Sequence, residues 1–518
     1  MLERETAWQR LRETWDILVV GGGITGAALL FEAARRGLRA ALVERADFAA
    51  GASSRSSKLV HGGLRYLAEG QIGLTRESVA ERERLLREAP GLVNPLPFLM
   101  PHYSGGRPSP LSLELGLTLY DLFAGHRRHR SVDAREALRI APPIASKRLR
   151  NAHAYVDATT DDARLVLRLL QEARALGAVA LNYAAASTLL QDGGGITGAR
   201  IVDTAGNRAV DAMARVVVNA CGAGSDALRL QLARQPKLRP LRGSHLLLPG
   251  WRLPLAVSVA FLHPRDARPV FAFPWLGATL VGTTDLDRDD DPSHEPSISR
   301  EEATYLLEAV EYQFPRATVP PADVISTYAG TRPVVAGGAA DPSRERRDTL
   351  ILAERGLVTV TGGKLTTFRP MALATLAALQ PLLGQRIDLT SRPVFTRAEP
   401  PVAAGLSGDQ RRRLSGYYGD RAQQLVDTTP QDERERIGGT DTLWAEMRWV
   451  ARNEGVVHLD DLLLRRTRLG LLTRDGGTRW FDRIRRICRD ELSWDDARFE
   501  SEAAAYREHL ATHHGMPV

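Results

Sequence analysis

The stretch DILVVGGGITGAALLFEAARRGLRAALVE, residues 16–44, decides the fold of this chain. Residues 16–21 are almost all apolar, which is typical of a strand buried in a parallel sheet. Residues 24–37 have helical spacing and end at a glycine, and residues 38–44 form a second apolar run. A strand, a helix and a strand in about 30 residues make a βαβ unit, so we expect an α/β fold.

The glycines between the first strand and the helix follow the pattern G-x-G-x-x-G. Gly21 permits a tight turn, Gly23 lets the backbone approach a diphosphate, and Gly26 lets helix and strand pack closely. The helix start directs free N–H groups at the phosphates. Glu44 closes the second strand, where a carboxylate accepts hydrogen bonds from ribose hydroxyls and repels a 2′-phosphate. This unit predicts a site for NAD or FAD.

A second glycine turn favours FAD over NAD. Residues 360–367, VTGGKLTT, run from a strand into Gly362 and Gly363 and then into a helix that we expect to begin near Thr366. Such a helix start stabilises negative charge at the N1/C2 carbonyl edge of a flavin. The position of the first motif at the extreme N-terminus favours FAD as well.

Further apolar runs at 178–184, 199–203, 214–222 and 357–363 predict strands of the same parallel sheet. Stretches at 245–249, 268–284 and 347–356 predict antiparallel strands of a separate sheet. After a turn-rich linker at 389–408, the pattern is helical, with clear amphipathic stretches at 461–472 and 479–492.

We therefore expect two interleaved domains and a helical cap. The FAD-binding domain takes residues 1–100, 151–230 and 351–390, a substrate- or membrane-facing insertion takes 101–150, an antiparallel substrate domain takes 231–350, and the cap takes 400–518.

Composition narrows the class of protein. The chain has 518 residues, too many for one ordinary core, and only Cys221 and Cys488, which excludes a disulfide framework and suits a reducing cytosol. No apolar run reaches the roughly 18 residues of a spanning helix, and the charged N-terminus does not resemble a signal peptide. We expect a cytoplasmic protein that meets a membrane only peripherally.

The net charge of +7 leaves several interpretations open. It suits an anionic substrate, an anionic membrane face or nucleic acid, and it also follows from a mildly basic, Arg-rich surface. Nucleic-acid binding is disfavoured because aromatic residues are only 6% of the chain, too few for a stacking platform.

A serine-rich segment follows the βαβ unit. Residues 51–67, GASSRSSKLVHGGLRYL, carry hydroxyls, glycines and cations that can bind phosphate and the edges of a flavin ring. A disordered linker has a similar composition, but the interleaved apolar residues Leu59, Val60, Leu64 and Leu67 argue against one.

These motifs together closely resemble the FAD-dependent glycerol-3-phosphate dehydrogenase family. The resemblance is carried, in order along roughly 16–390, by GGGITGA at 21–27, SSRSSKLVHGGLRYL at 53–67, VNACGAGSD at 218–226, RGSHLLLP at 242–249, YAGTRP at 328–333 and TGGKLTTFRPMA at 361–372. The second of these motifs is far more specific than any glycine pattern.

The resemblance implies a glutathione-reductase-like FAD domain, an antiparallel substrate domain and a helical cap. It implies oxidation of sn-glycerol 3-phosphate to dihydroxyacetone phosphate, with hydride passing from C2 to flavin N5 and electrons then passing to membrane quinone. We also expect a homodimer, placed peripherally on the inner face of the cell membrane.

The motifs and the resemblance give the expected FAD contacts: Gly21, Gly23, Ile24, Thr25, Gly26, Glu44, Ser53, Ser54, Ser56, Ser57, Gly62, Gly63, Leu64, Gly222, Gly363, Lys364, Leu365 and Thr366. The resemblance gives the phosphate anchors as Arg65, Arg347 and Lys364, with Tyr66 as a hydroxyl donor. The choice of Arg347 stays open, since other arginines lie close to it. Arg332 would lie near the C2 hydroxyl and favour the developing alkoxide.

Histidine is the natural general base at neutral pH. We prefer His61 for this role and expect His245 to line the substrate pocket, although the sequence leaves the choice open. No spacing of His, Cys, Asp and Glu suggests a metal site, and no Ser–His–Asp triad can be identified.

Residues 107–130 join many leucines to the basic run at 126–130, which suits an interfacial surface on anionic lipid. A buried core segment beside a solvated loop is the alternative. Arginine clusters at 411–413 and 465–468 in the cap compete as the docking face.

The nearest alternative function is a glycerol-3-phosphate oxidase that reduces O₂ to hydrogen peroxide. An amine or amino-acid oxidase on the same fold would need residues that bind a carboxylate rather than a phosphate.

Overall fold

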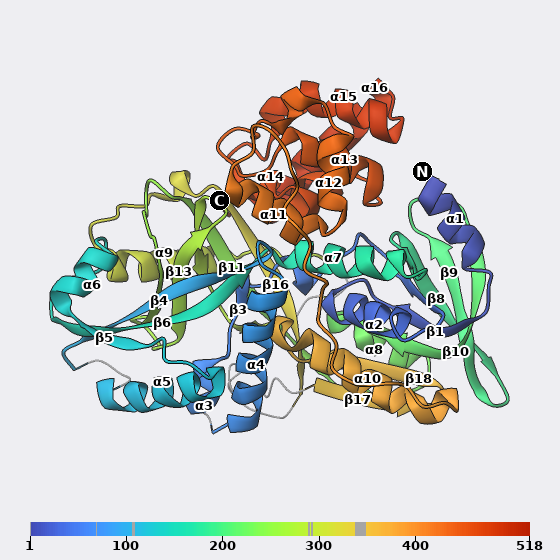
Figure 1. Ribbon diagram of the computed structural model, residues 1–518, viewed down its shortest axis with the longest axis horizontal. Coiled ribbons are helices and arrows are strands. Elements are labelled where there is room, and N and C mark those ends of the chain that lie inside the picture. Colours follow the sequence, from blue (N-terminus) through green and yellow to red (C-terminus); the bar gives the residue numbers. More distant parts are fainter. Residues whose placement is uncertain are drawn as a thin grey trace.

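The computed structural model describes residues 2–68, 70–105, 109–288, 291, 294–336 and 349–517. Two sheets lie side by side, and a helical domain built from the end of the chain sits above their junction (Figure 1).

The first strand is central to an eight-stranded sheet. The strands across it are β17 (Thr349–Glu354), β18 (Leu357–Gly362), β10 (Ala209–Asn219), β1 (Trp15–Val20), β2 (Ala40–Val43) and β7 (Val179–Leu181), while β8 (Ala184–Asp192) and β9 (Gly195–Asp203) extend it from β10. β18, β10, β1, β2 and β7 run parallel. Helix α2 (Ile24–Ala34) connects β1 to β2, which confirms the βαβ unit.

One strand belongs to a different sheet from the one that its pattern suggested. The run at 347–356 was expected in the antiparallel sheet, but β17 pairs antiparallel with β18 at the edge of the nucleotide sheet. The tight turn between them has Arg355 and Gly356 at φ of 51° and 88°. Two adjacent residues with positive φ give the twist that a short hairpin requires, so β18 folds back beside β17.

The second sheet is ten-stranded and carries the substrate side of the molecule. Its strands are β3 (Leu59–Val60), β4 (Val93–Tyr103), β5 (Arg130–Asp133), β6 (Leu149–Thr160), β11 (Leu238–Pro249), β12 (Ser258–Leu262), β13 (Pro269–Trp275), β14 (Ala278–Gly282), β15 (Leu286–Asp287) and β16 (Ser326–Val335). The pairs are antiparallel except that β12 runs parallel to β4. β3 and β4 thus join this sheet although both begin before residue 101, because both pair with β6.

The helices surround these sheets and build the cap. Around the sheets lie α1 (Leu2–Arg10), α3 (Leu64–Ala68), α4 (Ile72–Glu88), α5 (Pro110–Ala124), α6 (Ala134–Ile140), α7 (Asp162–Ala175), α8 (Ser225–Leu230), α9 (Arg300–Gln313) and α10 (Phe368–Leu383). The cap holds α11 (Gly408–Tyr418), α12 (Arg421–Asp427), α13 (Trp444–Asn453), α14 (Leu469–Leu472), α15 (Phe481–Leu492) and α16 (Asp496–His513).

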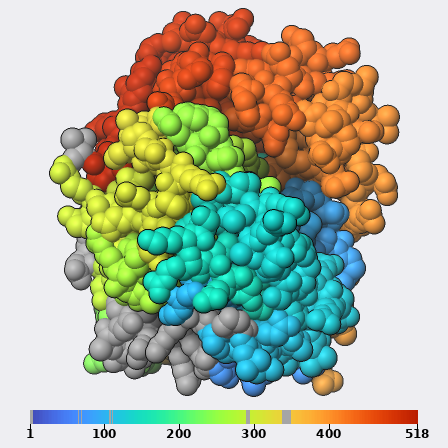
Figure 2. Space-filling view, turned by 90° about the vertical axis from the view of Figure 1, so that its left-hand side faces the viewer, coloured from blue at the N-terminus to red at the C-terminus, as the bar shows by residue number. Residues whose placement is uncertain are grey.

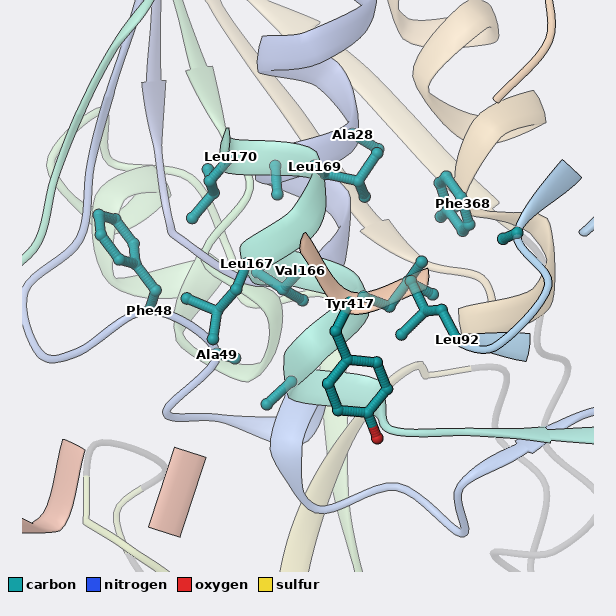
Figure 3. Close-up of a cluster of buried hydrophobic side chains, with 14 of the residues drawn as sticks. Ala28, Phe48, Ala49, Leu92, Val166, Leu167, Leu169, Leu170, Phe368 and Tyr417 are labelled. Atoms are coloured by element: carbon teal, nitrogen blue, oxygen red, sulfur yellow. The ribbon is translucent and has the colours of Figure 1, made fainter. Parts of the chain in front are cut away.

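Helix α7 is where the nucleotide domain and the cap share a core. Its residues 162–170 are all buried, as expected of a helix covered on every side. Figure 3 shows Leu167 and Leu170 beside Phe48, Leu169 towards Ala28 of α2, and Tyr417 of the cap on the same cluster. The cap is therefore part of the main hydrophobic core.

The expected amphipathic helix at 461–472 is instead a buried segment. It forms a wide helical turn, Asp461–Arg466, and then α14. Arg465 and Arg466 pair with Asp47 of the nucleotide domain, and Arg468 pairs with Asp161 and with Asp162. These arginines are at most 3% exposed, so this cluster is excluded as a membrane-docking face.

The Asp162 carboxylate, at the start of α7, ties three segments together. It accepts hydrogen bonds from the Ser56 backbone N–H at 2.9 Å and from its hydroxyl at 2.7 Å. It also pairs with Lys58 Nζ at 2.9 Å and with Arg468 Nη2 at 2.6 Å. Asp162 and Lys58 are both fully buried, and burial lowers the pKa of Lys58 to about 8 although Asp162 opposes the shift. The serine-rich segment is thereby anchored to both the nucleotide domain and the cap.

We expect Asp162→Asn to destabilise the protein strongly, because Lys58 would lose its buried ion-pair partner and Arg468 would lose one of its two. Breaking a buried pair costs about 3–5 kcal/mol. The midpoint of urea unfolding should fall clearly, whereas Asp409→Asn, on a side chain that is 96% exposed, should leave it unchanged. Equal midpoints for the two variants would show that Asp162 does not have this anchoring role.

Candidate active site

A cavity of about 1820 Å³ lies between the two sheets. Ordinary ligand sites measure about 300–1,000 Å³, so this one has room for a dinucleotide and a second molecule. Its wall includes the glycine turn after β1, the serine-rich segment, the glycine turn after β18, and residues of the ten-stranded sheet.

The first glycine turn has the geometry that a diphosphate site requires. Gly21 has φ of 116°, and a Cβ there would lie 2.4 Å from the Ala220 carbonyl oxygen. Gly23 precedes α2, and the Ile24 N–H donates to Ser53 Oγ at 2.9 Å. A Cβ on Gly26 would lie 1.9 Å from the Gly21 oxygen, so Gly26 serves helix packing and does not line the cavity.

Glu44 lines the cavity at the end of β2, as its position in the sequence predicted. Its carboxylate accepts from Gly22 N at 2.6 Å and from Ala46 N at 3.0 Å. Burial raises its pKa, and these two backbone bonds oppose the shift. A carboxylate offers about four lone-pair positions, so it retains capacity to accept from ribose hydroxyls.

Some residues of the serine-rich segment line the cavity, and others lie behind its wall. Ser53, Ser56 and Ser57 line the cavity. Ser54 is buried behind them, with its carbonyl oxygen bonded by Lys58 Nζ. Gly62 is also behind the wall, where its N–H donates to the Tyr120 hydroxyl at 2.7 Å. Ser54 and Gly62 were expected to contact FAD, but they do not line the cavity.

The second glycine turn meets the serine-rich segment in space. Gly363 has φ of 69°, and a Cβ on it would lie 2.5 Å from Met371 Sδ. Thr366 Oγ1 accepts from the His61 N–H at 3.2 Å, across 305 residues of sequence. A short 3₁₀ turn, Leu365–Thr367, leads into α10, close to the predicted helix start.

Cations gather in the wall of the cavity. Lys364 Nζ lies 3.8 Å from the centre of the Tyr66 ring and donates to Ser78 Oγ at 2.9 Å. Arg332 donates to Asp285 Oδ1 at 2.7 Å, and Arg268 donates to the Asp285 carbonyl at 2.8 Å. Both arginines line the cavity, so an acidic residue sets the position of two cations.

The wall also contains residues that were not predicted from the sequence, among them Arg268, Arg288 and Asp285. Asp285 lies in a polar run immediately after β14, and residues that follow a strand end often reach a site. That signal could have identified Asp285. The two arginines had no distinguishing motif among 69 lysines and arginines.

Two predicted phosphate anchors cannot be placed. Arg347 lies outside the described residues, as does the side chain of Arg65 on α3.

The two candidate histidines lie in different environments. His61 lines the cavity, with its ring stacked near that of Tyr66 at 6.4 Å between centres. His245 is buried behind Ser57, whose hydroxyl lies 2.8 Å from His245 Nε2. We expected His245 to line the substrate pocket, but it does not line the cavity. Burial, helped by the charge of Arg332, holds the pKa of His245 well below its usual value.

The cavity therefore brings together most of the predicted site residues. Those that line it are Gly21, Gly23, Ile24, Thr25, Glu44, Ser53, Ser56, Ser57, His61, Gly63, Leu64, Tyr66, Gly222, Arg332, Gly363, Lys364, Leu365 and Thr366.

The chain is similar to known proteins along most of its length. Residues 16–373 match the model of the FAD dependent oxidoreductase family, and residues 375–499 match the C-terminal domain of alpha-glycerophosphate oxidase. An aerobic glycerol-3-phosphate dehydrogenase of Staphylococcus haemolyticus is 33% identical over 496 residues, covering 90% of this chain and 89% of that protein. Its counterpart in Staphylococcus aureus strain RF122 is 32% identical, with 96% and 95% covered.

Solved structures show the same relationship. The glycerol-3-phosphate dehydrogenase of Bacillus halodurans, complexed with FAD, has a TM-score of 0.81 and 28% identity, covering 98% of this chain and 97% of that one. The L-alpha-glycerophosphate oxidase of Mycoplasma pneumoniae shares the fold at a TM-score of 0.58 and 17% identity, covering 75% of this chain and all of that one. This chain belongs to the family of FAD-dependent glycerol-3-phosphate dehydrogenases.

Proposed function

We propose that this protein oxidises sn-glycerol 3-phosphate to dihydroxyacetone phosphate and passes the electrons to membrane quinone. The observation that carries the proposal is a cavity with an FAD-type glycine turn at one side and a group of cations, Arg268, Arg288, Arg332 and Lys364, in the same wall. FAD bound there would supply the acceptor for the hydride that leaves C2.

The cations are suited to a substrate with a phosphate group. Guanidinium forks match phosphate oxygens, and anchoring the phosphate converts binding energy into alignment of the reacting carbon. Asp285 restrains Arg332 and Arg268, which reduces the entropy lost on binding. Lys364 and Tyr66 lie together in the wall of the cavity, and we propose both as partners of the phosphate.

His61 is our proposed general base. His61 lines the cavity. His245 does not line the cavity, and burial favours its neutral form. We assign His245 the role of orienting Ser57 through their hydrogen bond. Arg332 would stabilise the negative charge that develops on the C2 oxygen as its proton leaves.

We expect His61→Ala and Arg332→Ala to lose turnover while retaining yellow, bound flavin. Loss of a general base costs about 10²–10⁴-fold, and loss of a charge-stabilising donor costs about 10²–10³-fold in turnover. Steady-state kinetics with glycerol 3-phosphate and the flavin spectrum give the two readouts. Arg412→Ala, on an exposed arginine of the cap, is the control, and full turnover in both site variants would rule out these roles.

The substrate class can be tested without any electron acceptor. Under anaerobic conditions, glycerol 3-phosphate should bleach the flavin within the time of mixing, and glycine or other amino acids should not. Bleaching by amino acids alone would favour the amino-acid oxidase alternative.

The acceptor is a separate question, because the cap matches a domain named after alpha-glycerophosphate oxidase. We expect reduction of a soluble quinone analogue to be faster than formation of hydrogen peroxide in the same enzyme preparation. Stoichiometric peroxide with negligible quinone reduction would favour the oxidase.

Helix α5 is our proposed membrane contact. One face of it is buried, yet Leu111, Leu115 and Leu122 on the other are 72%, 66% and 72% exposed. Arg127 and Arg128 are exposed just after the helix. Apolar residues beside cations suit the surface of an anionic bilayer. The helix lies at the lower edge of the substrate domain, away from the cap (Figure 1).

Among the described residues, no helix has the length and hydropathy to span a bilayer.

The triple change Leu111→Ser, Leu115→Ser and Leu122→Ser should weaken binding to vesicles of anionic lipid at least tenfold, since each exposed leucine would lose about 1.5–3 kcal/mol of burial. Co-sedimentation at rising salt measures this, and wild-type binding should weaken with salt. Leu176→Ser, on a leucine 51% exposed after α7, is the matched control. Binding unchanged in the triple variant would place the contact elsewhere.

A further inference from the structure

Three side chains from distant parts of the sequence meet where the C-terminus contacts the substrate domain. Glu295 precedes α9, His509 lies on α16, and His514 follows that helix. Glu295 Oε1 lies 3.5 Å from His509 Nε2 and 3.8 Å from His514 Nε2, and the three atoms all lie within 4.8 Å of one another. Figure 2 shows the red C-terminal segment against the yellow part of the substrate domain on this side.

The hydrogen bonds of His514 fix its tautomer. Its Nδ1 lies 2.8 Å from the Thr327 carbonyl oxygen, which can only accept, so Nδ1 carries the proton. Nε2 is then an unprotonated lone pair. It is buried, it has no hydrogen-bond partner, and it faces a carboxylate oxygen. A metal-binding histidine typically has this arrangement, with its other ring nitrogen bonded to a backbone carbonyl.

The lone pair of His514 Nε2 faces Glu295 Oε1 at 3.8 Å, and no hydrogen bond joins the two atoms. Both atoms are acceptors, so a cation placed between them would satisfy both.

We propose that Glu295, His509 and His514 bind a divalent transition-metal ion of the Zn²⁺ class. Two imidazoles and one carboxylate, with water in the fourth position, form a common tetrahedral set. With metal–ligand bonds of about 2.0–2.2 Å, tetrahedral ligand atoms lie about 3.4 Å apart. The distances from Glu295 to the two histidines are close to that value.

Arg55 supports the ligating carboxylate and does not replace the metal. It forms an ion pair with Glu295, and its Nη1 also donates to the Ala50 carbonyl. Ligating carboxylates are commonly held by such an outer partner. Arg55 and Glu295 both line the large cavity, whereas the two histidines do not. The metal would thus connect the C-terminus to the cavity wall.

The position of the site suggests a structural role. His514 also holds β16 through two bonds with the Thr327 backbone, from its ring and from its carbonyl oxygen. β16 carries Arg332 of the proposed active site. A metal ion here would fasten the end of the cap to the strand and to the loop before α9, and so stabilise the assembled domains.

The test is Zn²⁺ binding by the flavin-loaded protein after treatment with a chelator. Isothermal titration should give one ion per chain, and Zn²⁺ should raise the melting temperature. Glu295→Gln and His509→Ala should each weaken binding at least tenfold and abolish the thermal shift, and an unchanged flavin spectrum would show that they fold.

Two controls separate this site from others. His513→Ala removes a neighbouring imidazole that is bonded to Ser297, and His153→Ala disrupts a different cluster in which His153 is bonded to Glu114. Both should bind Zn²⁺ like the wild type. Absence of binding by the wild type, or equal binding by Glu295→Gln, His509→Ala and His513→Ala, would overturn the proposal.

Discussion

The structure depends on the buried carboxylate of Asp162. An ionised carboxylate in a protein interior is costly unless its charge is paired and its lone pairs are satisfied. Asp162 meets this condition only when the serine-rich segment supplies Ser56 and Lys58 and the cap supplies Arg468. The nucleotide domain, the loop and the cap must therefore assemble together, and the loop that borders the cavity is held from behind.

The cavity wall also depends on contacts between segments that are far apart in the sequence. Several of its polar residues are held in place by contacts with segments that are distant in the sequence. Thr366 joins the second glycine turn to His61, and Asp285 restrains Arg332 from a neighbouring strand end. Side chains restrained in this way keep fixed directions, and such preorganisation favours alignment of reacting groups.

The parts of the fold and site that local sequence encodes were predicted well. Gly21 and Gly363 have positive φ, which few other residues adopt, so their positions are visible in the sequence itself. The run that became β17 was assigned to the wrong sheet, because a short apolar strand does not reveal its partner. His245 was expected to line the cavity, but it lies behind Ser57. The side of β11 that faces the cavity depends on how the second sheet packs.

The sequence by itself determined the βαβ unit, the preference for FAD and the family of this chain, because glycine turns and apolar periodicity are properties of neighbouring residues. Only the tertiary structure decided which charges face each other. The arginines at 465–468 resembled a surface cluster but are buried ion pairs, and Glu295, His509 and His514 have no recognisable spacing yet lie in contact. Long-range contacts of this kind arise from how whole domains pack, and sequence spacing carries no record of them.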